Sequence, residues 1–321
     1  MNWKMRAAIL EAPRKIVITE ALRVEPKADE VCVQLEGCGV CASNLSPWQG
    51  QPWFNYPFEA GAPGHEGWGR IVSIGSTIKE FQPGDRVGLL SLHAFAEFDV
   101  AKEDAVVKLP DNLRDLPFPA EPLGCAMNVF KRARIEKGET IAVIGIGFLG
   151  AIVVRLAALQ GATVIAITRA TKGLEIARSY GAGHCIRLDD HWRVIDAVKQ
   201  LTGGRLCNVV VEAVGKQWPL DLAAELTTER GRLVVAGYHQ DGPRKVNMQL
   251  WNWRGLDVIN AHERDPKIYH QGMQAAVDTI AAGNLDPSSL YTHRYPLDRI
   301  EEAFQAAADR PEGFMKALVL F

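Results

Sequence analysis

The feature that most constrains the fold is a glycine-rich turn between an apolar strand and a helix. It reads Gly145-Ile-Gly-Phe-Leu-Gly150 and fits the pattern G-x-G-x-x-G. The glycines permit a tight turn and close approach to a pyrophosphate, while the helix N-terminus supplies free N–H groups and a positive dipole end. An ordinary glycine-rich turn is the alternative. In this strand–turn–helix context the pattern predicts a dinucleotide-binding loop, with candidate residues Gly145, Gly147, Phe148, Leu149 and Gly150.

Strands and helices alternate from residue 140 onward. The apolar runs predict strands over 140–144, 163–168, 207–211, 232–236 and 257–260. Helical periodicity predicts helices over 149–160, 172–180 and 269–282, and the first two are followed by Gly161 and Gly181 at left-handed positions. This alternation predicts an α/β fold with a doubly wound parallel sheet and right-handed crossovers.

The chain has a different texture before residue 120. Short runs alternate apolar and polar residues with period two, as half-buried strands do, and they cover 31–36, 69–75, 85–90 and 105–109. They predict a compact antiparallel β region of roughly 115 residues. After Asp286-Pro287 we expect one helix near 297–308 and a final strand over 316–321.

Composition limits the function classes. The 321 residues contain 36 basic and 38 acidic side chains and carry a formal charge of −2, which gives no footprint for nucleic acid or an anionic membrane. The longest mostly apolar run, 141–154, is too short to span a bilayer. The first residues lack a signal-peptide core, and the six cysteines are sparse. We therefore expect a cytoplasmic protein of about two domains with reduced thiols.

Three segments hold candidate zinc ligands: Cys41 in 37–44, His65 and Glu66 in 64–67, and Glu121 in 120–123. Each has a simple alternative, respectively a small buried thiol, a surface ion pair and a helix start. Zinc binds thiolate, imidazole and carboxylate groups, and a catalytic site keeps one position open. The three segments together indicate a zinc site more strongly than any one of them alone.

Taken together, the motifs resemble the medium-chain dehydrogenase/reductase superfamily, in its zinc-dependent alcohol and polyol branch. That branch includes sorbitol, threonine and glucose dehydrogenases. The order and spacing match over nearly the whole chain, in Gly39-Val-Cys41-Ala-Ser43, Gly64-His-Glu-Gly67, Pro83-Gly-Asp-Arg-Val87, Glu121-Pro-Leu123 and Gly145–Gly150.

The resemblance implies a GroES-like β-barrel catalytic domain over 1–118 and 288–321, interrupted by a Rossmann domain over 119–287. It implies an alcohol dehydrogenase or carbonyl reductase (EC 1.1.1.-) with one catalytic zinc on Cys41, His65 and either Glu66 or Glu121. Ser43 would relay the substrate proton. A homodimer or homotetramer formed through the Rossmann domain is also implied.

The chain departs from the family pattern in three places. Only Gly88–Leu92 separates the Gly-Asp-Arg-Val motif from His93, so the lobe that holds a structural zinc is deleted and we predict none. Asn44 replaces the usual Asp, which weakens carboxylate support for the His ligand. Ser46 stands where some relatives end the proton relay with His, so proton exit needs another route.

The cofactor and substrate are less strongly encoded. The second strand ends at Thr168-Arg169, with Lys172 nearby, where NAD-binding folds usually carry Asp or Glu. These residues favour NADP over NAD, although a solvated basic helix start is an alternative. Aromatic residues that line a substrate cleft or pack in the core are Trp48, Trp53, Phe54, Tyr56 and Trp68; Trp251 and Trp253 are interface or core residues.

The resemblance implies that the substrate is a small alcohol or carbonyl compound, and a polyol, sugar or cyclitol would suit the aromatic residues. Two rival functions are a zinc-independent enoyl or quinone reductase and a non-enzymatic NADP-binding protein on the same scaffold. The set Cys41, His65 and Glu121 argues against the reductase, since those enzymes lack zinc ligands. Asn44 and Ser46 leave the non-enzymatic alternative open.

Overall fold

The structure is a computed structural model that describes residues 3–321. The chain forms two compact units: a β unit, up to Gly124 and from Arg264, and a parallel-sheet unit, Cys125–Glu263. Helix α8 (Pro266–Ala281) belongs to the β unit because it packs on β7 (Val106–Lys108). The domain limits expected from the sequence, at 118/119 and 287/288, stay a prediction.

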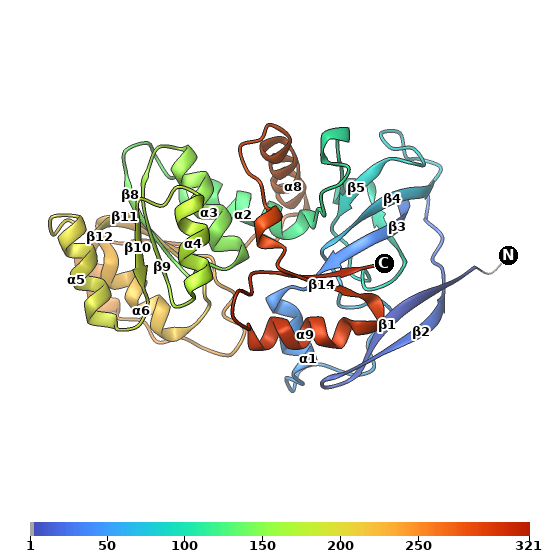
Figure 1. The fold of residues 1–321 in the computed structure, drawn as a ribbon, viewed down its shortest axis with the longest axis horizontal. Coiled ribbons are helices and arrows are strands. Elements are labelled where there is room, and N and C mark those ends of the chain that lie inside the picture. The colour runs from blue at the N-terminus through green and yellow to red at the C-terminus, as the bar shows by residue number, and fades with distance from the viewer. Residues whose placement is uncertain (1–2) are drawn as a thin grey trace. The chain divides into compact units, whose positions relative to one another are not determined.

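The β unit is built mainly on antiparallel strands, and the pair of β14 and β15 is parallel (Figure 1). One hairpin pairs β1 (Lys4–Ala12) with β2 (Lys15–Leu22). A larger sheet has the order β14-β15-β3-β4-β5-β7, and β6 pairs with β3. Its further strands are β3 (Glu30–Gly39), β4 (Gly67–Ile74), β5 (Arg86–Leu89), β6 (Phe98–Lys102), β14 (His293–Pro296) and β15 (Ala317–Leu320). Here the short helix α1 (Leu45–Trp48) and α9 (Ile300–Asp309) complete the unit.

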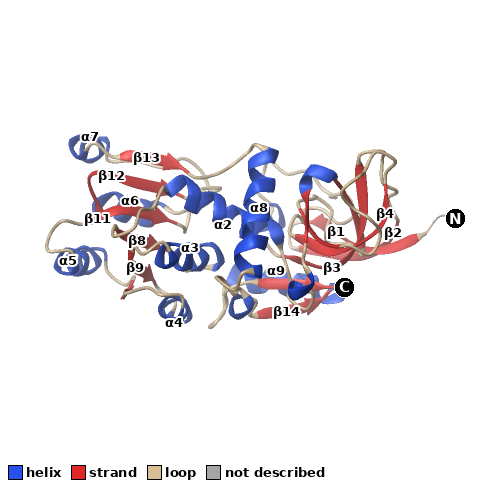
Figure 2. Cartoon of the chain, turned by 90° about the horizontal axis from the view of Figure 1, so that it is seen from above, coloured by secondary structure: helices blue, strands red, loops and turns tan. Residues whose placement is uncertain are grey.

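The parallel-sheet unit confirms the predicted doubly wound fold (Figure 2). Its six strands have the order β10-β9-β8-β11-β12-β13, and every pairing is parallel. They are β8 (Thr140–Ile144), β9 (Thr163–Thr168), β10 (His184–Arg187), β11 (Cys207–Glu212), β12 (Thr227–Val235) and β13 (Asp257–Asn260). The order reverses between β8 and β11, where ligands of such sheets bind.

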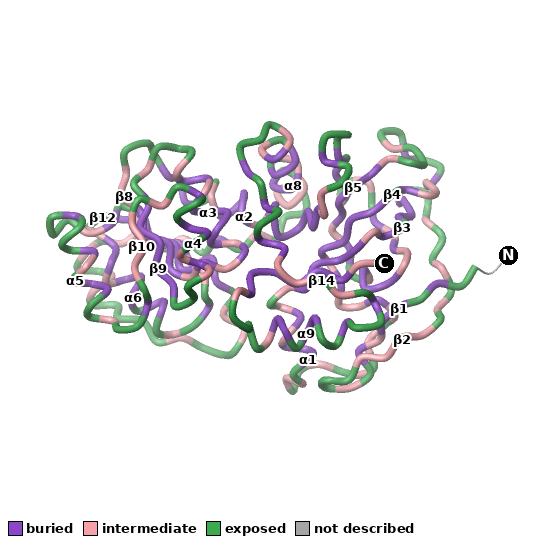
Figure 3. Tube along the Cα trace, in the orientation of Figure 1, coloured by how far each residue is buried: buried purple, intermediate pink, exposed green. Residues whose placement is uncertain are grey.

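Helices cover this sheet on both faces, because right-handed crossovers run in opposite directions from β8. They are α3 (Phe148–Leu159), α4 (Thr171–Ser179), α5 (His191–Leu201), α6 (Gln217–Leu226) and α7 (Met248–Arg254); α2 (Ala120–Ala133) crosses the unit boundary. The strand residues 141–144 are fully buried, whereas much of α5 is exposed (Figure 3).

The structure confirms the predicted strands 140–144 and 163–168 residue for residue. Two of the aromatic residues near the first ligand belong to the core. Trp48 and Trp68 are each 2% exposed, and Trp68 packs on Gly37, where an added Cβ would lie 2.4 Å from its ring. They therefore cannot line a cleft. In the same segment Trp53 is 60% exposed. Trp253 is exposed on α7, and Trp251 packs partly on the core.

Candidate metal and dinucleotide sites

Two neighbouring strands bring the ligand candidates together in the β unit. Cys38 of β3 pairs with Gly67 of β4, so the chain just beyond β3 lies beside the chain just before β4. As a result the ligand atoms of Cys41, His65 and Glu66 all lie within 4.8 Å of one another. Cys41 and His65 are half-buried, and Glu66 is fully buried.

Hydrogen bonds fix the ring of His65. Its Nδ1–H donates to the carbonyl oxygen of Pro63 at 3.0 Å, so Nε2 is the nitrogen that can bind a metal. Asn44 Nδ2 donates to the same oxygen at 2.9 Å and lies 3.4 Å from His65 Nδ1, while Asn44 Oδ1 accepts from the N–H of Cys41 at 2.9 Å. A backbone carbonyl thus supplies the support that a carboxylate gives in other sites.

The electrostatics of the cluster favour a cation. Burial lowers the pKa of His65, but its hydrogen bond to Cys41 and the negative charges of Cys41, Glu121 and Glu66 outweigh this and raise the pKa to about 10. The residues therefore stabilise a positive charge at this point, either a proton or a metal ion. A thiol, an imidazole and a carboxylate with ligand atoms within 4.8 Å of one another suit zinc, so the residues present fit the metal.

A buried lysine from the last strand region completes the cluster. Lys316 Nζ lies 2.6 Å from Oε1 and 2.5 Å from Oε2 of Glu66, and both side chains are almost wholly buried. Burial lowers the pKa of Lys316, but the charge of Glu66 and the neighbouring negative groups outweigh this and raise it. Gly39 makes room for the pair, because an added Cβ would lie 1.9 Å from Glu66 Oε2.

Glu121 belongs to the same neighbourhood. It lies in the first turn of α2, is 8% exposed, and its charge raises the pKa of both His65 and Lys316. Both carboxylates expected from the sequence therefore act on the cluster electrostatically, and Glu66 is the one with a ligand atom within 4.8 Å of those of Cys41 and His65. Ser43 is half-buried in the 3-10 turn Ala42–Asn44 that follows Cys41.

The glycine loop of the parallel-sheet unit has the shape that a pyrophosphate needs. Gly145 adopts φ +94°, and an added Cβ on Gly150 would lie 2.0 Å from the carbonyl oxygen of Gly145. Gly147 stands at the N-cap of α3, where no side chain can accept a hydrogen bond from the first N–H groups. Phe148 and Leu149 begin the helix. The cradle therefore fits a dinucleotide phosphate.

The end of β9 presents basic groups. Thr168 is 8% exposed, Arg169 is exposed, and Lys172 is half-buried at the start of α4 with its Nζ 3.5 Å from a carboxylate oxygen of Glu175. The Lys172–Glu175 pair is a surface pair of small energetic weight, so it leaves both cations available to a ligand.

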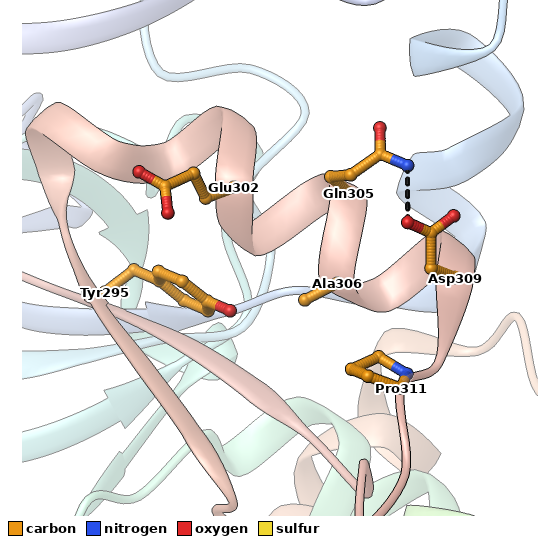
Figure 4. Close-up of a pocket in the computed structure, with 6 residues that line it drawn as sticks. All are labelled: Tyr295, Glu302, Gln305, Ala306, Asp309 and Pro311. Atoms are coloured by element: carbon orange, nitrogen blue, oxygen red, sulfur yellow. Dashed lines mark hydrogen bonds between the residues drawn. The ribbon is translucent and has the colours of Figure 1, made fainter.

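A groove of about 270 Å³ lies elsewhere on the β unit, along α9 and β14 (Figure 4). Gln305 Nε2 donates to Asp309 Oδ2 at 2.7 Å on its wall. It contains none of the candidate residues, and its polar groups are ordinary helix-surface side chains, so we assign it no role.

The sequence analysis did not identify Lys316 as a residue of the metal cluster. The one signal for it in the sequence is a lone cation in the apolar run 314–321.

Comparison with known proteins agrees with this geometry. The model of the alcohol dehydrogenase GroES-like domain matches residues 27–111, and that of the zinc-binding dehydrogenase family matches residues 149–282. An alcohol dehydrogenase of Geobacillus stearothermophilus is 30% identical over 85% of this chain and 89% of its own. Sorbitol dehydrogenase of Bacillus subtilis is 25% identical over 98% and 97%.

The fold is shared with solved structures as well. Galactitol-1-phosphate dehydrogenase of Escherichia coli superposes with a TM-score of 0.85 at 22% identity, over 99% of this chain and 100% of its own. The chain belongs to the zinc-binding alcohol dehydrogenase family, with a GroES-like domain and a Rossmann domain. It is an oxidoreductase at the level of EC 1.1.1.-. No helix within residues 3–321 is long and apolar enough to cross a membrane.

Proposed function

We propose that the protein is a zinc-dependent, NADP(H)-using dehydrogenase that interconverts a polyol, sugar or cyclitol and its carbonyl form. The observation that carries this proposal is the cluster of Cys41, His65 and Glu66, whose ligand atoms lie within 4.8 Å. Zinc-independent enoyl and quinone reductases lack such a set. The cluster also argues against the non-enzymatic alternative, because its thiol, imidazole and carboxylate suit a catalytic zinc.

Each residue has a defined task in the proposed reaction. Zinc at this cluster would act as a Lewis acid on the substrate oxygen, and a bound nicotinamide would exchange a hydride with the substrate carbon. Cys41 Sγ and His65 Nε2 would hold the zinc, and Glu66 or Glu121 would supply the carboxylate. Ser43 Oγ passes the hydroxyl proton between the substrate and water or the cofactor ribose. Ser46 offers no imidazole, so water completes proton exit.

The preference for NADP rests on Thr168, Arg169 and Lys172. A hydroxyl and two cations can bind a 2′-phosphate with charge-assisted hydrogen bonds, whereas the usual carboxylate would repel it. The exposure of Arg169 and the weak pairing of Lys172 support this assignment.

The substrate class rests on an aromatic cluster near Cys41 in the sequence. Phe54 packs 6.1 Å from both Trp53 and Phe58, and Tyr56 lies 5.5 Å from Phe58, measured between ring centroids. Trp53 is exposed. Tyr56 and Phe58 pack against the core of the β unit, so Trp53 and the half-buried Phe54 are the faces that can stack on a sugar or cyclitol ring. The relative named sorbitol dehydrogenase supports a polyol.

We also propose a homodimer or homotetramer formed through the Rossmann domain. Among residues 3–321, strand β13 is an edge of the six-stranded sheet, so one row of its backbone groups has no neighbouring strand there. Trp253 is 85% exposed and Val258 is 41% exposed on α7 and β13. Sedimentation of the wild-type protein and of Trp253→Ser should show a shift to smaller species in the variant.

The function is tested by metal analysis and by a turnover panel of polyols, sugars and aldehydes run with NADPH, NADP, NADH and NAD. We expect one zinc per chain and activity with the phosphorylated cofactors. Zero zinc in a metal-replete preparation would remove the catalytic proposal. Two zincs per chain would contradict the deleted lobe.

A further inference from the structure

Beyond the carboxyl ends of β11 and β12 lies a row of hydrogen-bonded polar side chains that the proposed function does not use; Glu212 is fully buried, and His239 and Arg244 are each 15% exposed. In a doubly wound sheet the glycine loop after β8 holds the pyrophosphate and the end of β9 holds the adenosine ribose. The strand order reverses between β8 and β11, so the other half of a dinucleotide lies over β11, β12 and β13. Every residue discussed below belongs to the parallel-sheet unit.

Glu212 lies at the centre of this row of hydrogen-bonded side chains. It is the last residue of β11 and is fully buried. Its Oε1 accepts hydrogen bonds from the backbone N–H groups of Val214 and Gly215, both at 2.7 Å, and its Oε2 accepts one from His239 Nε2 at 3.0 Å. The carboxylate therefore ties the loop after β11 to the loop after β12.

Arg244 fixes the proton on His239. Its Nε–H donates to His239 Nδ1 at 2.8 Å. A guanidinium can only donate, so Nδ1 carries no proton and Nε2 carries the one that it donates to Glu212. The bonds run in one direction, from Arg244 through His239 to Glu212. Arg244 also pairs with Asp241, which pairs with Lys216 at 2.5 Å.

The same groups hold two backbone loops in contact. An added Cβ on Gly237 would lie 2.1 Å from the backbone nitrogen of Gly215, and one on Gly215 would lie 2.6 Å from the carbonyl oxygen of Tyr238. Gly215 has φ +78°, and its carbonyl oxygen accepts from Arg244 at 3.0 Å. The loops at 213–216 and 236–239 are thus one preformed surface, on which Tyr238 is 47% exposed.

We propose that the chain Glu212–His239–Arg244 positions the nicotinamide half of the bound dinucleotide by holding these two loops in one shape. His239 is a positioning residue and does not itself react. The charges of Glu212, Arg244, Asp241 and Lys216 cancel, so the device supplies shape without a net charge beside a ring that changes charge during hydride transfer. The inference rests on the proposed function, since it takes the ligand to be a nicotinamide dinucleotide.

A ligand without nicotinamide makes the test specific. Dissociation constants of the full-length protein are measured by calorimetry for NADPH and for 2′-phospho-ADP-ribose, which lacks only the nicotinamide. His239→Phe keeps the ring and removes both nitrogens. We expect it to weaken NADPH binding about tenfold, the scale of one lost buried hydrogen bond, with unchanged affinity for the fragment. His239→Gln should recover most of the loss, because its amide can donate to Glu212 and accept from Arg244.

The control is His184→Phe, the same substitution at the first residue of β10, at the opposite edge of the sheet. It should leave both dissociation constants unchanged. Equal weakening of both ligands by His239→Phe would mean general damage to the domain and would overturn the inference, as would unchanged binding of both. Wild-type protein that binds neither NADPH nor the fragment, and neither NADH nor ADP-ribose, would instead remove the proposed function, and the inference with it. If only the unphosphorylated pair binds, the same comparison is made with NADH and ADP-ribose.

Discussion

Asn44 and His65 donate hydrogen bonds to the same acceptor, the carbonyl oxygen of Pro63, at 2.9 and 3.0 Å. Asn44 also accepts the N–H of Cys41. One amide side chain therefore connects the two ligand segments, and the shared carbonyl oxygen determines that Nδ1 of His65 carries a proton. The sequence suggested that losing the usual carboxylate weakens the site, yet the backbone carbonyl provides an equivalent acceptor.

The first prediction concerns this amide. Asn44→Ala removes three contacts and should lower zinc affinity by about 10- to 100-fold, the usual effect of losing such a partner. Asn44→Asp keeps the acceptor for the Cys41 N–H and should retain most of the affinity. Competition with a chromogenic chelator measures both. Equal zinc affinity in Asn44→Ala and wild type would show that His65 is oriented without it.

The second prediction concerns protons. The pKa of His65 in the metal-free cluster is about 10, because its bond to Cys41 and the nearby negative charges outweigh the effect of burial. At pH 7 His65 is therefore protonated, and zinc must displace that proton. Calorimetry in two buffers of different ionisation enthalpy should show its release. Zinc binding that takes up protons or releases none would contradict this.

The same shift fixes the pH dependence of stability. The folded-state pKa of His65 lies above the ordinary value of 6.5, so its stabilising effect is complete below pH 6.5 and disappears as the pH rises through about 10. The melting temperature of the metal-free protein should fall across this window more steeply than that of metal-free His65→Asn. Parallel curves for the two proteins would rule out this contribution.

Sequence predicts the local parts of this protein well and the long-range pairs poorly. The glycine loop and the motifs around Cys41 and His65 are short patterns, so the spacing of their residues was enough to predict them from the sequence. The pair Glu66–Lys316 joins residues 250 positions apart, and no local pattern encodes it. The hairpin of β1 and β2 was missed because its turn, Pro13-Arg14, lacks the usual Gly or Asn; Arg14 adopts φ +56°.

Helices were missed where their caps were weak or overlooked. Helix α5 has a regular start, since Asp190 accepts from the N–H of Arg193 at 2.8 Å, and this signal could have been used. Helix α6 has no side-chain cap at Lys216 and depends on packing against β11 and β12. The aromatic residues show the same limit, because closeness to His65 in sequence did not reveal that Trp68 fills the space over Gly37.

The third prediction tests the buried ion pair of Glu66 and Lys316 by a substitution at the neighbouring Gly39. Gly39→Ala places a methyl group 1.9 Å from Glu66 Oε2 and 3.0 Å from Lys316 Cε. The free energy of unfolding should fall by about 1–3 kcal/mol, as for other overpacked cores, and zinc content should decrease. Gly183→Ala is the control, since its Cβ meets only the carbonyl oxygen of Val164 at 3.9 Å. Denaturant unfolding measures both variants. An equal decrease in the free energy of unfolding in both would argue against a special role for Gly39.

The fourth prediction concerns proton relay. Ser43→Ala should retain zinc and cofactor and lower the rate by roughly 100-fold or more, the scale of a proton-transfer contribution. Ser43→Thr keeps a hydroxyl and should recover part of the activity. Single-turnover kinetics, in which chemistry limits the rate, provide the measurement. An unchanged rate in Ser43→Ala would show that the proton takes a path that avoids this hydroxyl.

The fifth prediction concerns the basic end of β9. Arg169 is exposed at the point where the adenosine ribose is expected. Arg169→Ala should weaken NADPH binding by about 1.5–3 kcal/mol if it makes a charge-assisted contact, with little change for NADH, which has no 2′-phosphate. Arg178→Ala, in the last turn of α4, removes the same charge at the far end of the helix that follows Arg169 and should leave the preference intact. Fluorescence titration with both cofactors gives the ratio of affinities directly. A wild-type protein that binds NADH as tightly as NADPH would show that Thr168, Arg169 and Lys172 form an ordinary solvated helix start.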